Sequence, residues 1–169
     1  MKVWREHSAG GVTIEEKVYP VTPPSMTVKS GMITGEVIDL KVTERVEKGS
    51  DRVVSPARLT GTLRLLNSSA NRTVRLVEGR VRFIDAREQP IPPGAGQTDP
   101  IVKFSRYGHE WLDPDQGASY ALDVDFPVEA LQANRLKEIR LELAYIPSPF
   151  REETVNFPVS IGTGPASEV

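Results

Sequence analysis

Residues 120–126 read YALDVDF, and large apolar side chains alternate there with alanine and aspartate. Successive side chains of a β-strand point to opposite faces, so a period of two places the apolar side chains on one face and the carboxylates on the other. The segment therefore predicts a strand with one buried face and one wet face. The residues of its predicted inward row are Tyr120, Leu122, Val124 and Phe126.

The same period of two recurs along most of the chain, whereas helical periodicity hardly appears. Residues 139–145 and residues 155–161 continue it, and each is predicted to form a further strand. Pro158 lacks the N–H that a ladder hydrogen bond requires, so the last strand is expected at a sheet edge or beside a bulge. The further inward rows predicted are Ile38, Leu40 and Val42; Leu59, Gly61, Leu63 and Leu65; Val77, Gly79, Val81 and Phe83; Ile139, Leu141, Leu143 and Tyr145; and Val155, Phe157, Val159 and Ile161.

Turn signals connect these rows. Residues 48–51 read KGSD and predict the turn of a long hairpin between the row at residues 38–42 and the row at residues 59–65. Val74 and Leu76 fall on the opposite parity from the residues that follow, which predicts a bulge or bend near residues 78–79. After a loop rich in proline and glycine, residues 101–104 are expected to form one short strand.

About seven to nine strands, with a turn signal roughly every ten residues, are typical of an antiparallel β-sandwich. A closed barrel is the alternative, but turns of uneven length and edge-adapted strands favour the sandwich. The expected fold is all-β with one short helical turn over residues 128–134, led by Pro127, because proline is best tolerated at the start of a helix. The predicted organisation is an N-terminal strand (residues 12–19) with a proline-rich linker over residues 1–32, a sandwich over residues 33–162 and a disordered tail over residues 163–169.

The composition is that of a globular protein without a strong charge bias. Of 169 residues, 38% are hydrophobic and 26% are charged, and the net charge is -2. These values argue against wholesale disorder and against a general nucleic-acid binder, and no apolar run approaches the ~20 residues that span a bilayer.

Cysteine is absent, which removes disulfides and cysteine zinc sites without deciding the compartment. The opening MKVWREHSAGG lacks the apolar core of a signal peptide, so we expect either a cytoplasmic chain or a mature segment with a start methionine.

Residues 107–120, YGHEWLDPDQGASY, gather histidine, aromatic rings and carboxylates in one window. Asp113 and Asp115 are spaced like the start of a calcium loop, but Gly117 stands at the next ligand position and no bidentate glutamate follows. The two histidines of the chain lie far apart in sequence, and no nucleophile-elbow motif frames the serines that flank His109. We therefore predict no catalytic residue, no metal site and no cofactor, and interpret the window as a loop between two strands.

The segment at residues 59–91, LTGTLRLLNSSANRTVRLVEGRVRFIDAREQPI, resembles the FxLYD domains of bacterial envelope proteins and the related water-stress domains of late-embryogenesis-abundant type. The resemblance rests on Gly61 in the first strand, on the turn Asn67-Ser68-Ser69 and on the run VRFID at residues 81–85. Of the four residues of the FxLYD signature, Asp85 is identical here.

Residues 112–117, LDPDQG, resemble the later turn of that family, and the likeness covers about half of the chain. It implies an immunoglobulin-like sandwich with an extracytoplasmic, non-catalytic role, and it supplies no set of active-site residues. The same positions have plain structural reasons. Asn67 suits a turn because a short polar side chain bonds its own backbone, and Asp85 can accept backbone hydrogen bonds in the turn after its strand.

Two groups of side chains are candidates for binding. The rings of the 107–120 window either anchor a partner or a sugar, or plug the open end of the sandwich, and the sequence leaves both open. The segment from residue 58 to residue 87 contains seven arginines and two acidic residues, which gives it a net charge of +5. They form either solvated strand faces offset by Asp123, Asp125 and Glu142, or a shallow anion-binding face. The candidate binding residues are Tyr107, His109, Trp111, Arg64, Arg80 and Arg82.

The predicted function is a non-enzymatic interaction or accessory module of the bacterial cell envelope, periplasmic or envelope-bound, with the cytoplasm as the other possible location. Its partner is expected to be a protein or a second copy of the chain, with neither nucleic acid nor a membrane span. The N-terminal strand is expected to add to an exposed sheet edge of its own or a neighbouring copy. The alternative is a module that binds a polysaccharide or an anionic polymer.

Overall fold

The structure, a computed structural model, describes residues 3–9, 12–93, 99–104, 110–132, 135–150 and 153–162. These residues form an almost purely β structure. Its elements are β1 (Val3–Ala9), β2 (Val12–Pro20), β3 (Met26–Ser30), β4 (Ile33–Glu47), β5 (Val53–Asn67), β6 (Arg72–Asp85), β7 (Ile101–Val102), β8 (Glu110–Leu112), β9 (Gly117–Asp125), the 3-10 turn η1 (Val128–Leu131) and β10 (Leu136–Pro149).

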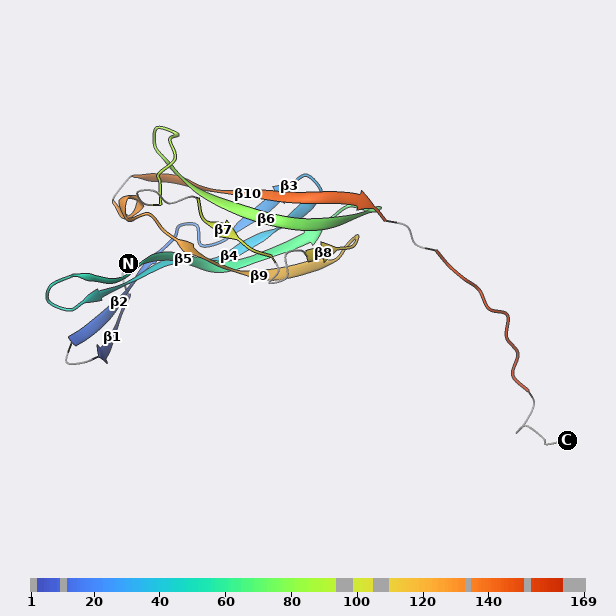
Figure 1. Cartoon of the computed structure of the whole chain (residues 1–169), viewed down its shortest axis with the longest axis horizontal. Helices are drawn as coiled ribbons and strands as arrows, with labels where there is room; N and C mark the ends of the chain where they lie inside the picture. The colour runs from blue at the N-terminus through green and yellow to red at the C-terminus, as the bar shows by residue number, and fades with distance from the viewer. Residues whose placement is uncertain are drawn as a thin grey trace.

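Two antiparallel sheets pack face to face, as Figure 1 shows, so the all-β sandwich is confirmed. The large sheet has the order β1-β2-β4-β5-β9, and β3 pairs with β4 beyond the end of β2. In the small sheet, β6 pairs with β10 on one side and with β7 and β8 on the other. The strand β1, a hairpin partner of β2, is not among the strands expected from the sequence.

The alternating rows build the core between the sheets. Leu122, Val124 and Phe126 are buried while Asp123 and Asp125 are exposed, as predicted. From the small sheet, β6 contributes Val74, Leu76, Val81 and Phe83, all at 1% exposure or less. The rings of Phe83, near the end of β6, and Phe126, just after β9, meet edge to face with centroids 5.0 Å apart and so connect the two sheets.

The long hairpin is confirmed as β4 and β5, with its turn at residues 48–50. One residue of its predicted inward row is wrong. The pairing shifts between Ile38 and Lys41, and Asp39 takes a positive φ of 56°. This irregularity moves side chains to the other face, so Val37 packs against the core in place of Ile38.

The bulge predicted in β6 is also present. The register with β10 shifts where Leu76 pairs with Tyr145 and Glu78 pairs with Ala144, which leaves Val77 as the extra residue. The prediction that Val77 belongs to the inward row is wrong, because its side chain is 41% exposed, whereas Val81 beyond the bulge is buried as predicted. Because of the bulge, both halves of a strand whose apolar residues change parity still face the core.

The strand predicted over residues 155–161 is wrong. Residues 153–162 are extended but belong to no sheet, and Figure 1 shows them leaving the body beyond the end of β10. The other terminus agrees better with the prediction, because residues 12–20 form β2 and add to β4 of their own sheet. The short helical turn is confirmed as η1 after Pro127. The predicted disordered tail at residues 163–169 lies outside the described residues.

Candidate functional site

A groove opens along the side of the sandwich where β3 of the large sheet faces β10 of the small sheet. It has a volume of about 440 Å³. We call it the lateral groove. Its lining is mostly apolar and comes from the end of β2, the linker to β3, the middle of β4, η1 and the start of β10. The lining residues are Tyr19, Pro20, Val21, Thr22, Pro23, Met26, Leu40, Val42, Phe126, Ala130, Leu131, Leu136, Lys137, Glu138 and Ile139.

The lateral groove leads towards the core. A smaller space of about 60 Å³ adjoins it, and Met26, Leu40 and Ile139 line both. Its inner wall includes Leu59 and Val81, which are almost fully buried. An apolar ligand or strand in this groove would therefore contact core side chains directly.

The incomplete burial of β10 marks the same side of the molecule. Its inward row, Ile139, Leu141, Leu143 and Tyr145, packs against the core but is only partly buried. The facing residues of β6 are buried completely. Among the described residues, no strand pairs with the outer edge of β10. The backbone N–H and C=O groups on that edge are thus available for pairing, as on any edge strand.

Tyr145 closes one end of this open side. Its hydroxyl donates a hydrogen bond to the carbonyl oxygen of Ser30 at 3.1 Å, and the N–H of Met32 donates to the same hydroxyl at 3.4 Å. These bonds join β10 of the small sheet to the turn between β3 and β4 of the large sheet. Towards the start of β10 the groove stays open.

At the open end, the ring of Tyr19 lines the groove while its hydroxyl donates to Glu44 Oε1 at 2.7 Å. Burial of the ring, with a smaller effect from the bond to Glu44 and its charge, raises the pKa of Tyr19 to about 12. Glu44 is itself 8% exposed, so this pair places a buried carboxylate next to a groove whose lining is mostly apolar. The protonated phenol satisfies the buried carboxylate.

The outer face of the small sheet carries a second candidate surface. Trp111 of β8 is 49% exposed, and the Arg75 guanidinium lies 5.8 Å from the centre of its ring. Arg75 pairs across the sheet with Trp111 on one side and with Ile146 on the other, so the three side chains form one row. Trp111 therefore does not plug the sandwich. Its neighbour Leu112 is the buried residue at this position.

The arginines predicted to bind anions do not form one face. Arg64 lies on the outer face of the large sheet, and Arg80 and Arg82 lie on the outer face of the small sheet, on the opposite side of the molecule. Arg64 pairs with Glu36 at 3.1 Å, and Arg82 pairs with Asp99 at 3.2 Å and Glu142 at 3.5 Å.

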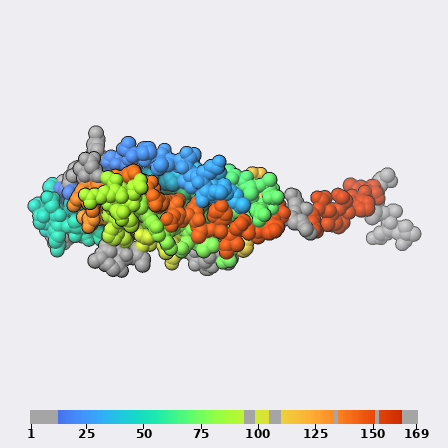
Figure 2. Space-filling model, turned by 90° about the horizontal axis from the view of Figure 1, so that it is seen from above, coloured from blue at the N-terminus to red at the C-terminus, as the bar shows by residue number. Residues whose placement is uncertain are grey.

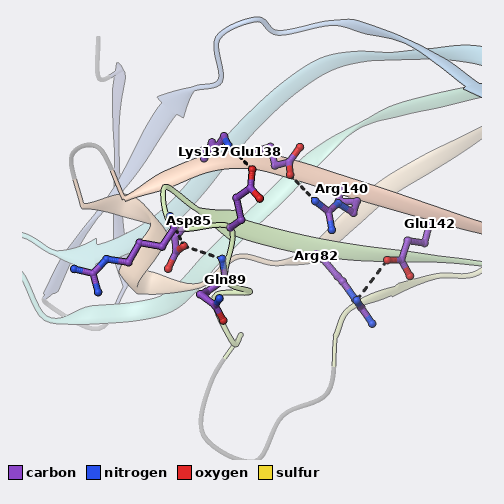
Figure 3. Close-up of polar contacts among 9 residues, drawn as sticks. Arg82, Asp85, Gln89, Lys137, Glu138, Arg140 and Glu142 are labelled. Atoms are coloured by element: carbon purple, nitrogen blue, oxygen red, sulfur yellow. Dashed lines mark hydrogen bonds and ion pairs between the residues drawn. The ribbon is translucent and has the colours of Figure 1, made fainter.

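Figure 3 shows the same arrangement along β6 and β10, where cationic side chains point to neighbouring carboxylates and not to a common centre. On the large sheet, Arg58 bonds Asp123 and Asp125 at 2.6 Å each. These pairs favour the interpretation that the arginines lie on solvated strand faces, where neighbouring carboxylates neutralise their charge.

The remaining predicted residues of the 107–120 window divide into two groups. Tyr107 and His109 lie outside the described residues. Asp113 accepts a hydrogen bond from the Thr73 hydroxyl at 2.9 Å, and its backbone N–H bonds Gln116, so it holds the turn between β8 and β9. Within the described part of the chain, no group of three or more histidine, aspartate or glutamate side chains is placed to hold a metal ion.

The turns singled out in the sequence are built from side-chain hydrogen bonds, as expected. The buried amide of Asn67 donates to the carbonyl oxygens of Arg72 and Leu112, and its oxygen accepts from the Ser69 N–H. Asp85 Oδ1 accepts from the backbone N–H groups of Arg87 and Gln89. These bonds, that of Gln89 first, hold the pKa of Asp85 below its ordinary value.

Sequence reasoning missed the residues that form the lateral groove. Met26 and Leu40 lie in strands whose partners cannot be read from local periodicity. The alternation of residues 139–145 does indicate an inward row, but it does not indicate that one edge of the strand is free.

No family model, no curated protein and no solved structure matches this chain. The likeness of residues 59–91 to FxLYD domains stays a prediction. Across the described ranges, no helix has the length and apolar character that crossing a membrane requires.

Proposed function

We propose that the chain is a non-enzymatic interaction module that contacts a protein partner or a second copy through the open side of its sandwich. The observation that carries this proposal is the lateral groove, with the unpaired outer edge of β10 beside it. Apolar surface that adjoins a free strand edge is the combination that recognises an added strand, because the edge supplies backbone hydrogen bonds and the groove receives alternate side chains.

The charge distribution supports the same proposal. Glu138, which lies at the mouth of the groove, is paired with Arg140 at 2.6 Å, and Lys137 is paired with Glu88 at 2.9 Å. The interior of the groove is lined by aliphatic and aromatic side chains. An apolar segment with few charges fits this lining better than an ionic ligand does.

The test is the mass of the full chain, measured by light scattering over a wide range of concentration. Self-association through the groove should raise the mass with concentration. Met26→Glu introduces a charge at the groove entrance, where Met26 is 55% exposed, and should lower the mass. Val128→Glu is the matched control, because Val128 is 64% exposed and lies outside the groove lining. Equal effects of the two variants would contradict the proposal.

A carbohydrate or anionic-polymer binder is the second candidate, favoured by the half-exposed ring of Trp111 beside Arg75. Stacking of a sugar on this ring would change its fluorescence. Titration with oligosaccharides should then give a saturable signal that Trp111→Phe weakens and that Arg64→Gln, on the opposite face, leaves unchanged. A signal unaffected by Trp111→Phe would exclude this surface.

The cell-envelope location, expected from the resemblance alone, remains part of the proposal. Fractionation of the native cells with an antibody to the chain tests it directly. Recovery with the cytosolic fraction would contradict an envelope location without affecting the proposed contact surface.

A further inference from the structure

The segment at residues 153–162, ETVNFPVSIG, has the side-chain pattern of a half-buried strand but no sheet to pair with. Its apolar residues occupy every second position and are strongly exposed. Their exposures are 71% for Val155, 78% for Phe157, 86% for Val159 and 94% for Ile161. A continuous apolar row of this kind in water is unfavourable and marks a contact surface.

The strand β10, whose start lines the lateral groove, presents a complementary row. Ile139, Leu141, Leu143 and Tyr145 of β10 also occupy every second position, point inward and are only partly buried. Each row extends over six residue steps, which is about 20 Å in an extended strand. A strand laid beside β10 with its apolar face inward would match these side chains in spacing and in number.

Proline at position 158 restricts how the segment can pair. It has no N–H, so the side of the strand on which residue 158 would bond must face away from the partner. The odd-numbered residues, which include Phe157 and Val159, would then form the backbone hydrogen bonds to β10. This arrangement leaves Pro158 on the outer edge, where proline is tolerated.

The direction of the segment bears on whether it fills the lateral groove of its own chain or that of a second copy. In Figures 1 and 2 the segment stands clear of the body and points away from β3 and from the start of β10, where the lateral groove opens. In this arrangement its apolar row is exposed to solvent.

We propose that residues 153–162 of one copy insert as a strand into the lateral groove of a second copy and pair with the free edge of β10. This inference deepens the proposed function and rests on it. The donated strand and the receiving groove are different surfaces, so each copy can give one strand and receive another. Such a head-to-tail contact closes into a ring or extends as a filament.

The first test separates the two faces of the segment. Phe157→Glu places a charge on the apolar row, and Asn156→Glu places the same charge on the opposite face of the same strand. Loss of a buried phenylalanine contact should raise the dissociation constant of self-association by about a hundredfold for Phe157→Glu, with little change for Asn156→Glu. Light scattering measures both, and circular dichroism checks that both variants keep the β spectrum.

The second test uses complementation between two disabled copies. Phe157→Glu keeps an intact groove, and Met26→Glu keeps an intact donor segment. Each variant alone should be monomeric, and their mixture should form a heterodimer of one copy each that does not grow further. A fluorescent peptide of residues 153–162 should bind the Phe157→Glu protein and not the Met26→Glu protein.

The outcomes distinguish this inference from the proposed function. If Met26→Glu abolishes association while Phe157→Glu does not, the groove is a contact surface but the donor segment is wrong. If both variants and their mixture stay monomeric while the peptide binds the Phe157→Glu protein, the segment fills the groove of its own chain and insertion into a second copy is overturned. A wild-type chain that stays monomeric at every concentration, with no peptide bound by the Phe157→Glu protein, overturns this inference and self-association through the groove, and leaves a different protein as the partner in the proposed function.

Discussion

The hydroxyl of Tyr145 donates a hydrogen bond to the carbonyl oxygen of Ser30 at 3.1 Å, and this bond ties the small sheet to the large sheet at one end of the lateral groove. The residues are 115 positions apart in the chain. The contact sets how far the two sheets can separate on the side where the edge of β10 is open.

Tyr145→Phe should lower the free energy of unfolding by about 1 kcal/mol, the typical net value of such a hydrogen bond. Urea denaturation measures the change. Tyr120→Phe is the matched control, because the buried Tyr120 hydroxyl has no hydrogen-bond partner among the described residues. Its removal should be neutral or stabilising. An equal loss in the two variants would show that the bond to Ser30 contributes nothing.

Asn67→Ala should be strongly destabilising, by about 2 to 4 kcal/mol, because it leaves buried backbone groups unpaired and opens a small cavity. The groups that lose the bond to Asn67 are the Leu112 carbonyl oxygen, the Ser69 N–H and the Arg72 carbonyl oxygen, which keeps a bond from the Ser69 hydroxyl. Thermal or urea unfolding measures the effect. Asn71→Ala, in the same turn but exposed, is expected to change stability by less than about 0.5 kcal/mol.

Asp85 should contribute to stability in a pH-dependent way. Its pKa is lowered in the folded protein, chiefly by the hydrogen bond from the Gln89 N–H, so the folded state binds fewer protons than the unfolded state as the pH falls. The contribution is present above the ordinary value of 3.8 and is lost as the pH drops through the lower folded value. Asp85→Asn should therefore be less stable at neutral pH and show a weaker loss in acid.

Urea unfolding of the wild type and of Asp85→Asn over a series of acidic pH values measures this difference. The difference should persist at high salt, since backbone hydrogen bonds and not distant charges are its main cause. If salt removes it, the arginines near Asp85 and not the turn produce the lowered pKa.

Tyr19 predicts the opposite behaviour in alkali. Its pKa is raised from 10.0 to about 12, so the folded state holds the phenolic proton longer than the unfolded state does. The corresponding stability is complete below pH 10.0 and is lost as the pH rises to about 12. Tyr19→Phe should flatten the fall of stability in this range, although Tyr120, whose pKa burial also raises, still contributes. Titration of phenolate absorbance should lose the component that ionises near pH 12.

The periodicity of the sequence predicted much of the fold because alternation is a local property. The row at residues 120–126, the hairpin turn at residues 48–50 and the bulge of β6 are all read from neighbours in the chain. Ile38 and Val77 are exceptions within these strands. The positive φ of Asp39 shifts the register, and nothing in the spacing of apolar residues announces it.

The candidate sites were less predictable because they depend on which strands become neighbours. Arg64 and Arg82 lie close in sequence but on opposite faces, since β5 and β6 belong to different sheets. Trp111 and Leu112 are adjacent, yet the pairing of β8 with β6 decides that the leucine is inside. The turn roles of Asn67 and Asp85 were predictable because the bonds that shape each turn reach only a few positions along the chain. The bond from Asn67 to the distant Leu112 carbonyl was not predictable in this way.

By itself, the sequence determined that the chain forms amphipathic strands and which side chains of each strand share a face. The tertiary structure alone decided that residues 139–145 belong to an edge strand and that residues 155–161, with the same alternation, pair with no strand in the described part of the chain. The physical reason is that side-chain alternation is set by the backbone of one strand, whereas a groove or an unpaired edge depends on hydrogen bonds between strands distant in the chain.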